Sequence, residues 1–279
     1  MKKENAIIRI VIFSIVIILL LGILVAGLGI GTFIGRFRYS TSGGQAVSSG
    51  EVDAAQVKDL NIQWVSGSVT IQPRDTDTIQ FSEDADVPED EKLVWKLNGD
   101  TLVIQFCRAT IFSGFEANYS KNLVVTVPED WVCSTLELEL VSVEAEVTNL
   151  TANRIEVENV SGECQFEECS TDSFSAETVS GGVDFTGTLR KLSFDTVSAD
   201  CTAILYSAPM ELELDGVSGN LDITLPADCG FTAEIDSASG TIRSDFSAAV
   251  SGDRYSYGDG SCHIDGDTLS GNIVIRKGN

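Results

Sequence analysis

The sequence predicts an all-β fold, a β-solenoid of coils about 19–21 residues long with an N-terminal β cap, preceded by one transmembrane helix. Three observations predict it. The tripeptide Val-Ser-Gly or a close variant occurs eight times between residues 65 and 271. Apolar residues recur at the same offsets around these tripeptides, which is typical of repeat architectures. A long, almost uncharged run stands near the N-terminus, ahead of all the repeats.

The apolar run predicts a membrane anchor. Residues 7–35 contain no ionisable side chain except Arg9. A helix crosses the bilayer core with about 20 apolar residues, whereas a cleavable signal peptide has an apolar part of about 7 to 15. We therefore expect a cytoplasmic tail at residues 1–6, a transmembrane helix at 7–35 in the lipid bilayer of the cell membrane, and an extracytoplasmic C-terminal domain. A cleaved signal peptide is the alternative.

The same segment carries a spacing of small residues that permits close packing of two membrane helices. Gly27, Gly31 and Gly35 make two overlapping small-xxx-small patterns. Such patterns let helix backbones approach closely, so the chain is a candidate homodimer through these glycines. Membrane helices are rich in glycine in any case, so a monomeric anchor stays open.

Two regions separate the apolar run from the regular repeats. Residues 36–56 are expected to form a flexible stalk, because the stretch 40–50 is rich in serine and glycine. Residues 57–127 are expected to form an N-terminal β cap that covers the first coil. In this region an acidic loop at 83–91 is followed by a β-hairpin, whose turn is Asn98-Gly99-Asp100.

The repeats at residues 128–279 predict the solenoid. From Val141 the steps between tripeptides are 19, 19, 18, 20, 21 and 31 residues. Apolar residues stand at offsets −5, −3, 0, +4 and +6 from the first tripeptide residue, as in Leu136, Leu138, Val141, Ala145 and Val147. Offsets that differ by two indicate strands with one inward face, so each coil has two short strands joined at a glycine corner. An antiparallel sandwich is the alternative, but it gives no reason for a near-constant step.

Charge and cysteine content exclude several classes of function. The chain has a formal net charge of −24, so we expect no nucleic-acid partner, because phosphate backbones would be repelled. The seven cysteines form no Cys-x-x-Cys pair, so they give neither a zinc signature nor a readable disulfide framework.

One outward position is acidic in every repeat from Val141 onward. At offset −2 stand Glu139, Glu158, Glu177, Asp195, Asp215, Asp236 and Asp267. Equivalent positions stack in a solenoid, so these carboxylates are expected to form a row, and binding of calcium or a cationic partner is one hypothesis for it. The alternative is an inherited surface charge that opposes aggregation. No other cofactor and no catalytic residue is expected.

The repeats resemble the putative-adhesin domain family of bacterial envelope proteins. The matching segments are Leu123 to Pro128 (LVVTVP), Leu136 to Val141 (LELELV), Ile155 to Gly162 (IEVENVSG), Leu221 to Pro226 (LDITLP) and Asp267 to Ile275 (DTLSGNIVI). The resemblance covers about residues 57 to 279. It implies an extracytoplasmic β-solenoid of unknown function, and no set of catalytic residues transfers with it.

These observations favour a non-catalytic interaction, adhesion or scaffold module of the cell envelope, whose partner is an envelope polymer or a membrane protein. A regulatory partner of a membrane-bound envelope-stress sensor is the first alternative. A carbohydrate-acting enzyme is the weaker one, because such enzymes cluster carboxylates in a cleft, whereas here the carboxylates recur one per repeat.

Overall fold

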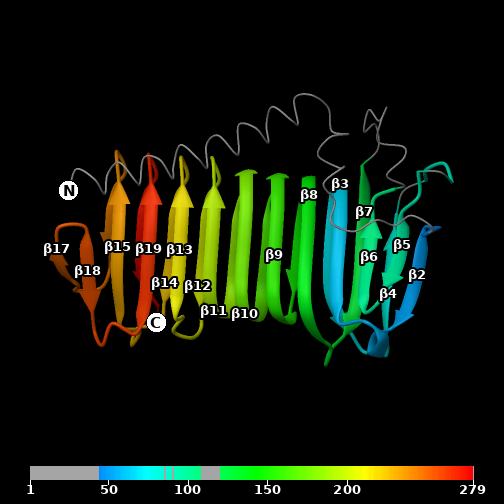
Figure 1. Cartoon of the computed structure of the whole chain (residues 1–279), viewed down its shortest axis with the longest axis horizontal. Coiled ribbons are helices and arrows are strands. Elements are labelled where there is room, and N and C mark those ends of the chain that lie inside the picture. Colours follow the sequence, from blue (N-terminus) through cyan, green and yellow to red (C-terminus); the bar gives the residue numbers. More distant parts are fainter. Residues whose placement is uncertain (1–43, 85, 90, 108–119, 279) are drawn as a thin grey trace.

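The computed structural model describes residues 44–84, 86–89, 91–107 and 120–278. The expected tail at 1–6, the transmembrane helix at 7–35 and the glycines at 27, 31 and 35 lie outside the described residues. Within the described part of the chain, no helix has the length and hydrophobicity needed to cross a membrane. The strands stand side by side in one long row (Figure 1).

The described residues form a hydrogen-bonded sheet of 20 strands with one short 3-10 helix, η2 (Ala54–Gln56). The N-terminal strands are β1 (Gln45–Ala46), β2 (Ser49–Asp53), β3 (Asp59–Arg74), β4 (Thr78–Glu83), β5 (Val94–Asn98), β6 (Thr101–Gln105) and β7 (Lys121–Pro128). The central strands are β8 (Val132–Thr148), β9 (Thr151–Ser161), β10 (Cys164–Ser180), β11 (Val183–Thr196), β12 (Cys201–Leu205), β13 (Glu211–Gly216) and β14 (Leu221–Leu225). The C-terminal strands are β15 (Phe231–Ser237), β16 (Ile242–Ser244), β17 (Ala249–Ser251), β18 (Arg254–Tyr257), β19 (Cys262–Thr268) and β20 (Ile273–Lys277).

The strands form two facing layers, and the predicted solenoid is confirmed. The parallel strands of the first layer follow the order β6, β3, β8, β9, β10, β11, β13, β19, β15. Those of the second layer follow the order β7, β3, β8, β10, β11, β12, β14, β20, β16. The long strands β3, β8, β10 and β11 bend and contribute to both layers. Each central coil also has a short third side, where Ala152 pairs with Cys133 and Thr171.

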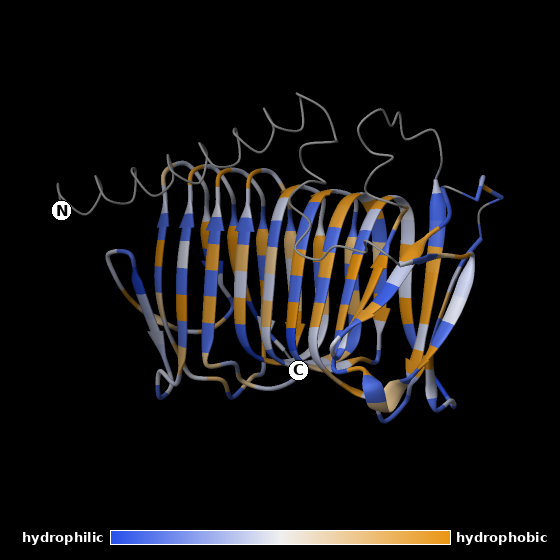
Figure 2. Cartoon of the chain, turned by 45° about the vertical axis from the view of Figure 1, so that its right-hand side comes forward, coloured by the Kyte–Doolittle hydropathy of each residue, from blue (hydrophilic) through white to orange (hydrophobic). Residues whose placement is uncertain are grey.

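The core lies between the layers. Hydrophobic and hydrophilic residues alternate along the strands (Figure 2), and the hydrophobic ones are the buried ones. The predicted inward positions at −5, −3, +4 and +6 are buried, as Leu136 and Leu138 show at the first regular coil, except that Ile242 and Ser244 are only partly buried. The prediction for offset 0 is wrong. Val141 is only partly buried, and the preceding residue, Leu140, is fully buried instead. Strand alternation explains this, because offsets −5, −3 and −1 share one face while −4, −2 and 0 share the other.

The coils do not follow chain order at the C-terminal end. The last coil, β19–β20, lies between β13–β14 and β15–β16. After β16 the chain forms the antiparallel hairpin β17–β18, and β18 pairs with the outer edge of β15. The chain then returns to the inner side of β15. The weakly matching repeat at 231–244 is therefore the terminal coil, where a complete apolar set is not needed.

The N-terminal end also differs from the predicted cap and stalk. β3 is an interior coil, because β6 and β7 pair with its outer side and β8 with its inner side. The predicted hairpin is confirmed as β5–β6, with Gly99 at φ 69° in its turn. Antiparallel strands β1, β2, β4 and β5 complete this end. Within residues 44–56, the expected stalk is wrong, because β2 pairs with β4 and Val52 is buried beside Ile79.

Glycine is required at the corners for two reasons. Gly162 has φ 111°, and a Cβ there would lie 2.1 Å from the carbonyl oxygen of Val143 in the neighbouring coil. Gly67 repeats this geometry, with φ 109° and a Cβ position 2.1 Å from the carbonyl oxygen of Lys121. Positive φ and the close stacking of corners therefore both exclude a side chain. Val143 and Ala199, which replace glycine in this column, are buried.

Candidate functional site: an acidic ladder

The acidic row predicted from the repeats is contiguous on the outward side of the first layer. Direct register pairs join its members strand by strand. In spatial order they are Glu139, Glu158, Glu177, Asp195, Asp215, Asp267 and Asp236, and we call this set the acidic ladder. All seven predicted residues are brought together, and only the order of the last two is exchanged by the returning coil.

The ladder concentrates like charges at the strand spacing. Adjacent strands lie about 4.8 Å apart, so neighbouring carboxylates are held close by the backbone itself. Two unit charges at about 5 Å repel by about 0.8 kcal/mol in bulk water and by about 3 kcal/mol at an effective dielectric of 20. The ladder is therefore a surface that a cation or a cationic group would stabilise.

A column of mostly valine residues at offset 0 accompanies the ladder. The offset 0 residues, such as Val197 and Val217, are partly buried on the same outward side as the carboxylates. Burial, and then neighbouring carboxylates, raise the pKa of Asp195, Asp215 and Asp267 to about 6. These three aspartates therefore have pKa values of about 6, well above the ordinary range of an aspartate.

The glutamates of the ladder vary more in environment. The side chain of Glu158 reaches solvent, yet partial burial and then the charges of Glu139 and Glu177 raise its pKa. Glu139 is buried, with 6% of its surface exposed. Its Oε1 accepts hydrogen bonds from Asn61 Nδ2 at 3.0 Å and from Gln63 Nε2 at 2.9 Å.

Neutral amide side chains continue the row beyond Glu139. The sequence analysis did not predict them, because it followed only the acidic residues at this offset. Gln63 lies beside Glu139 on the next strand, and Gln105 lies beside Gln63. Gln105 Nε2 donates to Gln63 Oε1, and both residues are buried. Gln63 stands at offset −2 from Val65, so the repeat template contains it, although it carries no charge.

The ladder has the geometry of a line and not of a chelate. Among the described residues, no group of three His, Cys, Asp or Glu side chains is arranged to hold one metal ion. Each strand contributes one ladder carboxylate, so a calcium ion on the ladder would bridge neighbouring strands. Calcium binding stays a prediction.

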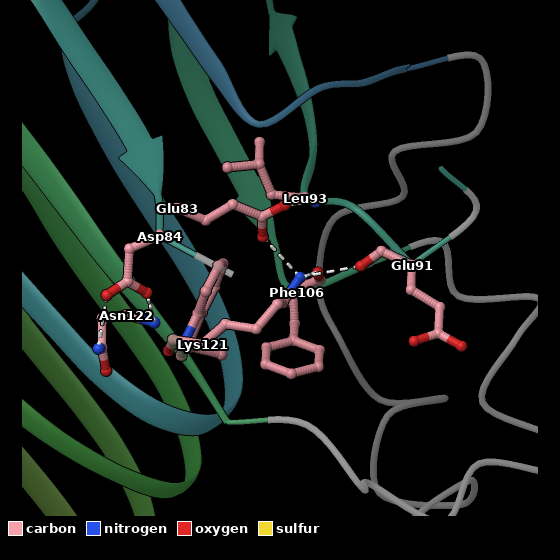
Figure 3. Close-up of polar contacts among 8 residues, drawn as sticks. Glu83, Asp84, Glu91, Leu93, Phe106, Lys121 and Asn122 are labelled. Carbon is pink, nitrogen blue, oxygen red and sulfur yellow. Dashed lines mark hydrogen bonds and ion pairs between the residues drawn. The ribbon is translucent and has the colours of Figure 1, made fainter. Parts of the chain in front are cut away.

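A second polar cluster, which the sequence did not reveal, surrounds the buried Lys121 at the start of β7 (Figure 3). Lys121 Nζ lies 2.7 Å from Glu83 Oε2, and the two side chains are 1% and 0% exposed. Its ammonium also donates to the carbonyl oxygens of Phe106 and, at 3.0 Å, of Glu91. The ring centroids of Phe106 and Trp64 are 4.1 Å and 5.1 Å from Nζ.

The Lys121 cluster connects five segments of the N-terminal end. Glu83 Oε1 also accepts from the backbone N–H of Leu93 at 3.1 Å, and Trp64 Nε1 donates to the Lys121 carbonyl oxygen at 2.9 Å. Burial lowers the pKa of Lys121, and Glu83 opposes that change. Because the cluster is inaccessible to solvent, we assign it to holding the ends of β4, β6 and β7 together. Glu83 was expected to begin the acidic loop at 83–91, but it is the last residue of β4 and is buried.

The other reactive side chains do not form a site with the ladder. Cys164 and Cys201 are buried, are not disulfide-bonded and lie two strands apart, with Val183 between them. Burial raises the pKa of both thiols to about 12, so neither is a thiolate near neutral pH. His263 lies in β19 and is exposed.

Comparisons with known proteins give structural neighbours and a family. No curated protein matches the chain. A crystal structure of a "putative cell adhesion protein" from Clostridium sporogenes is 12% identical, with 82% of this chain and 98% of that chain covered and a TM-score of 0.37. A "putative adhesin" from Bacteroides fragilis is 13% identical, with coverages of 82% and 95% and a TM-score of 0.39. A "putative lipid binding protein" from Parabacteroides distasonis is 13% identical, with coverages of 83% and 96% and a TM-score of 0.29.

The family model with the description Toastrack DUF4097 matches residues 57–266, which is most of the chain. Its span contains the repeats up to the start of the last coil, the acidic ladder except Asp267, and the Lys121 cluster. The resemblance to adhesin-like envelope domains inferred from the repeat segments is consistent with this match. The chain belongs to the Toastrack DUF4097 family.

Proposed function

We propose that the protein is a membrane-anchored, extracytoplasmic and non-catalytic interaction module, which binds a cationic partner in the cell envelope through the acidic ladder. The apolar run at residues 7–35 supports the anchor, and the single such run supports an exported C-terminal domain. The solenoid holds the ladder rigidly because every coil is hydrogen-bonded to its neighbours.

The observation that carries the proposal is the in-register ladder itself. Seven carboxylates on consecutive strands create a strip of negative charge along one side of the domain. A strip of this kind recognises an extended cationic surface better than a compact ligand, because its charges are spaced along a line. Linear spacing also supports a non-catalytic role, because catalysis by carboxylates needs them to converge on one bond.

Carbodiimide crosslinking of intact cells that carry the full chain tests this function. The reagent activates carboxylates and joins them to amines in direct contact, so mass spectrometry can locate the contact residues. We expect crosslinked peptides to contain ladder carboxylates and to be lost in the variant with Asp195, Asp215 and Asp267 changed to Asn. A wall polymer as the joined partner supports adhesion, whereas a membrane protein supports the regulatory alternative.

A control variant matches the change in charge. Glu144, Glu146 and Asp184 are exposed on the second layer, so changing them to Gln, Gln and Asn removes the same charge away from the ladder. The control is expected to retain the crosslinks. Equal crosslinking of the ladder variant and the wild-type chain would exclude the ladder as the contact surface.

Membrane topology has its own test. We propose that the N-terminus is cytoplasmic and that the solenoid is outside. Protease added to intact protoplasts should then digest the domain, and digestion only after the membrane is broken would contradict this orientation.

A further inference from the structure

We propose that a small pocket beside the buried end of the acidic ladder binds a primary ammonium group. The inference deepens the proposed function, since it gives the chemical class of the cationic partner. The pocket has a volume of about 250 Å³ on the outward side of the first layer. Its polar lining includes Asp59, Asn61, Thr101, Thr135, Arg154 and Glu156.

Asn61 supplies the observation that points to a ligand. Only 1% of its surface is exposed, and its Oδ1 is buried without a hydrogen-bond partner. The other amide atom, Nδ2, donates to Glu139 Oε1 at 3.0 Å. Since a carboxylate oxygen cannot donate, this contact fixes which amide atom is the oxygen. A buried acceptor without a donor is unfavourable, so the site is suited to a ligand that brings one.

The strand register places Asn61 in the wall of the pocket. Asn61 pairs with Glu137, and Glu139 lies two residues farther along β8. On the opposite side, Asp59 pairs with Thr101 and Thr135, and all three line the pocket. Asn61 itself lines the pocket, and because its Nδ2 is engaged by Glu139, Oδ1 is the amide atom left for a ligand donor.

The charge of the lining selects a cation. The pocket is bordered by three carboxylates, of Asp59, Glu137 and Glu156, and by one guanidinium, of Arg154. Arg154 Nη1 already pairs with Glu156 Oε1 at 3.1 Å. The lining therefore carries a net negative formal charge, and the hydrogen bond from Asn61 to Glu139 connects it to the ladder. A neutral hydroxyl would satisfy Asn61 Oδ1 but not this charge.

Size and donor count favour a primary ammonium. Pockets for whole drug-sized ligands have volumes of about 300–1,000 Å³, so this one suits a terminal group of a longer molecule. An ammonium carries three donors on one compact charge, which can meet an amide oxygen and nearby carboxylates together. An amine-bearing polymer that lies along the ladder could place one such group in the pocket.

The test uses the full chain in uncharged detergent, labelled with ¹⁵N at asparagine, and three acetylated amino-acid amides as probes. Lysine has the ammonium donors, trimethyllysine has the charge without donors, and norleucine has neither. We expect the lysine probe to shift the Asn61 side-chain resonance and to bind about tenfold more tightly than the trimethyllysine probe, as one charge-assisted hydrogen bond allows. Equal affinity of these two probes, or a lysine-induced shift that leaves Asn61 unmoved, overturns the inference.

Variants provide an independent readout. Asp59→Asn and Asn61→Ala are expected to weaken binding of the lysine probe, whereas Glu213→Gln, an exposed position on the same layer outside the pocket, is expected to leave it unchanged. Tighter binding of an arginine probe would overturn the ammonium assignment in favour of a guanidinium. If the probes fail while the ladder crosslinks persist, the pocket inference fails and the proposed function stands. If the crosslinks alone are lost, the failure belongs to the proposed function.

Discussion

The buried pair of Lys121 and Glu83 should make a large and strongly coupled contribution to stability. Each side chain is almost fully buried, and their charged atoms are 2.7 Å apart. Glu83→Gln leaves the ammonium buried with a neutral partner, and Lys121→Met leaves the carboxylate without its counter-charge. Breaking a buried ion pair from one side costs about 3–5 kcal/mol, because the remaining charge is uncompensated.

The double variant should lose less stability than the sum of the two single losses. When both charges are removed, no buried charge lacks a partner, so the second substitution adds little to the first. We expect a coupling free energy of about 2–3 kcal/mol between the two positions. Lys121→Met removes the hydrogen bonds to Phe106 and Glu91 whether or not Glu83 is also changed. Their loss therefore cancels and does not contribute to the coupling free energy.

Urea denaturation followed by tryptophan fluorescence measures these effects, since Trp64 lies 5.1 Å from the Lys121 ammonium. The matched control is the exposed pair of Lys58 and Asp100, which is 2.9 Å apart with side chains 71% and 50% exposed. A surface pair of this kind contributes at most about 1 kcal/mol. Losses below about 1 kcal/mol for both single variants at the buried pair, or additive effects in the double variant, would refute the reasoning.

Three further predictions concern the ladder and the corners. The pKa values of Asp195, Asp215 and Asp267 are raised from 3.8 to about 6, so their contribution to stability is fully present below about pH 4 and is lost as pH rises through 6. The unfolding free energy of the wild-type chain, compared with that of the variant with all three changed to Asn, should therefore fall between pH 4 and 7. The expected fall is about 1 kcal/mol per carboxyl after allowance for solvent screening. A difference between the two chains that does not change with pH would contradict this. Gly162→Ala should cost more than about 2 kcal/mol, whereas Gly99→Ala, at φ 69° in open space, should cost about 1 kcal/mol, and equal urea midpoints would count against the corner geometry. Millimolar calcium should raise the melting temperature of the wild-type chain more than that of the triple variant, and an equal rise in both would remove calcium as a ladder ligand.

The solenoid and the ladder could be predicted because both follow from the repeat period of the sequence. An offset of two between apolar residues gives the inward face, and a constant step stacks equivalent positions. Glu158 and Glu177 illustrate this, since they share an offset and become neighbours on adjacent strands. Every predicted ladder residue lies on the outward face of the first layer for the same reason.

The order of the terminal coils could not be predicted in this way. Asp236 and Asp267 have the same offset, so the template cannot tell which of them pairs with Asp215. The structure gives this place to Asp267, because the β17–β18 hairpin covers the outer edge of β15 and returns the chain inward. The repeat contains no signal for such a return.

Contacts between segments that do not share a repeat position also cannot be predicted from the repeat pattern. Glu83 and Lys121 are far apart in the sequence and occupy no common offset, so their pairing depends on the packing of the N-terminal end. Asn61 and Gln63 stand at offsets −4 and −2 of an early repeat, but as amides they carry no charge pattern. The pocket at Asn61 depends on the neighbouring strand β6, which the sequence assigned to a cap.

The central claim is that the ladder carboxylates form one coupled, partly buried surface, and direct titration of their side-chain carboxyl resonances by NMR tests it. The account predicts midpoints near 6 for Asp195, Asp215 and Asp267 in the wild-type chain. Asp84 is the internal control, because its hydrogen bonds from Asn122 lower its pKa below 3.8. Ladder midpoints near 3.8, as for an ordinary exposed aspartate, would contradict the claim.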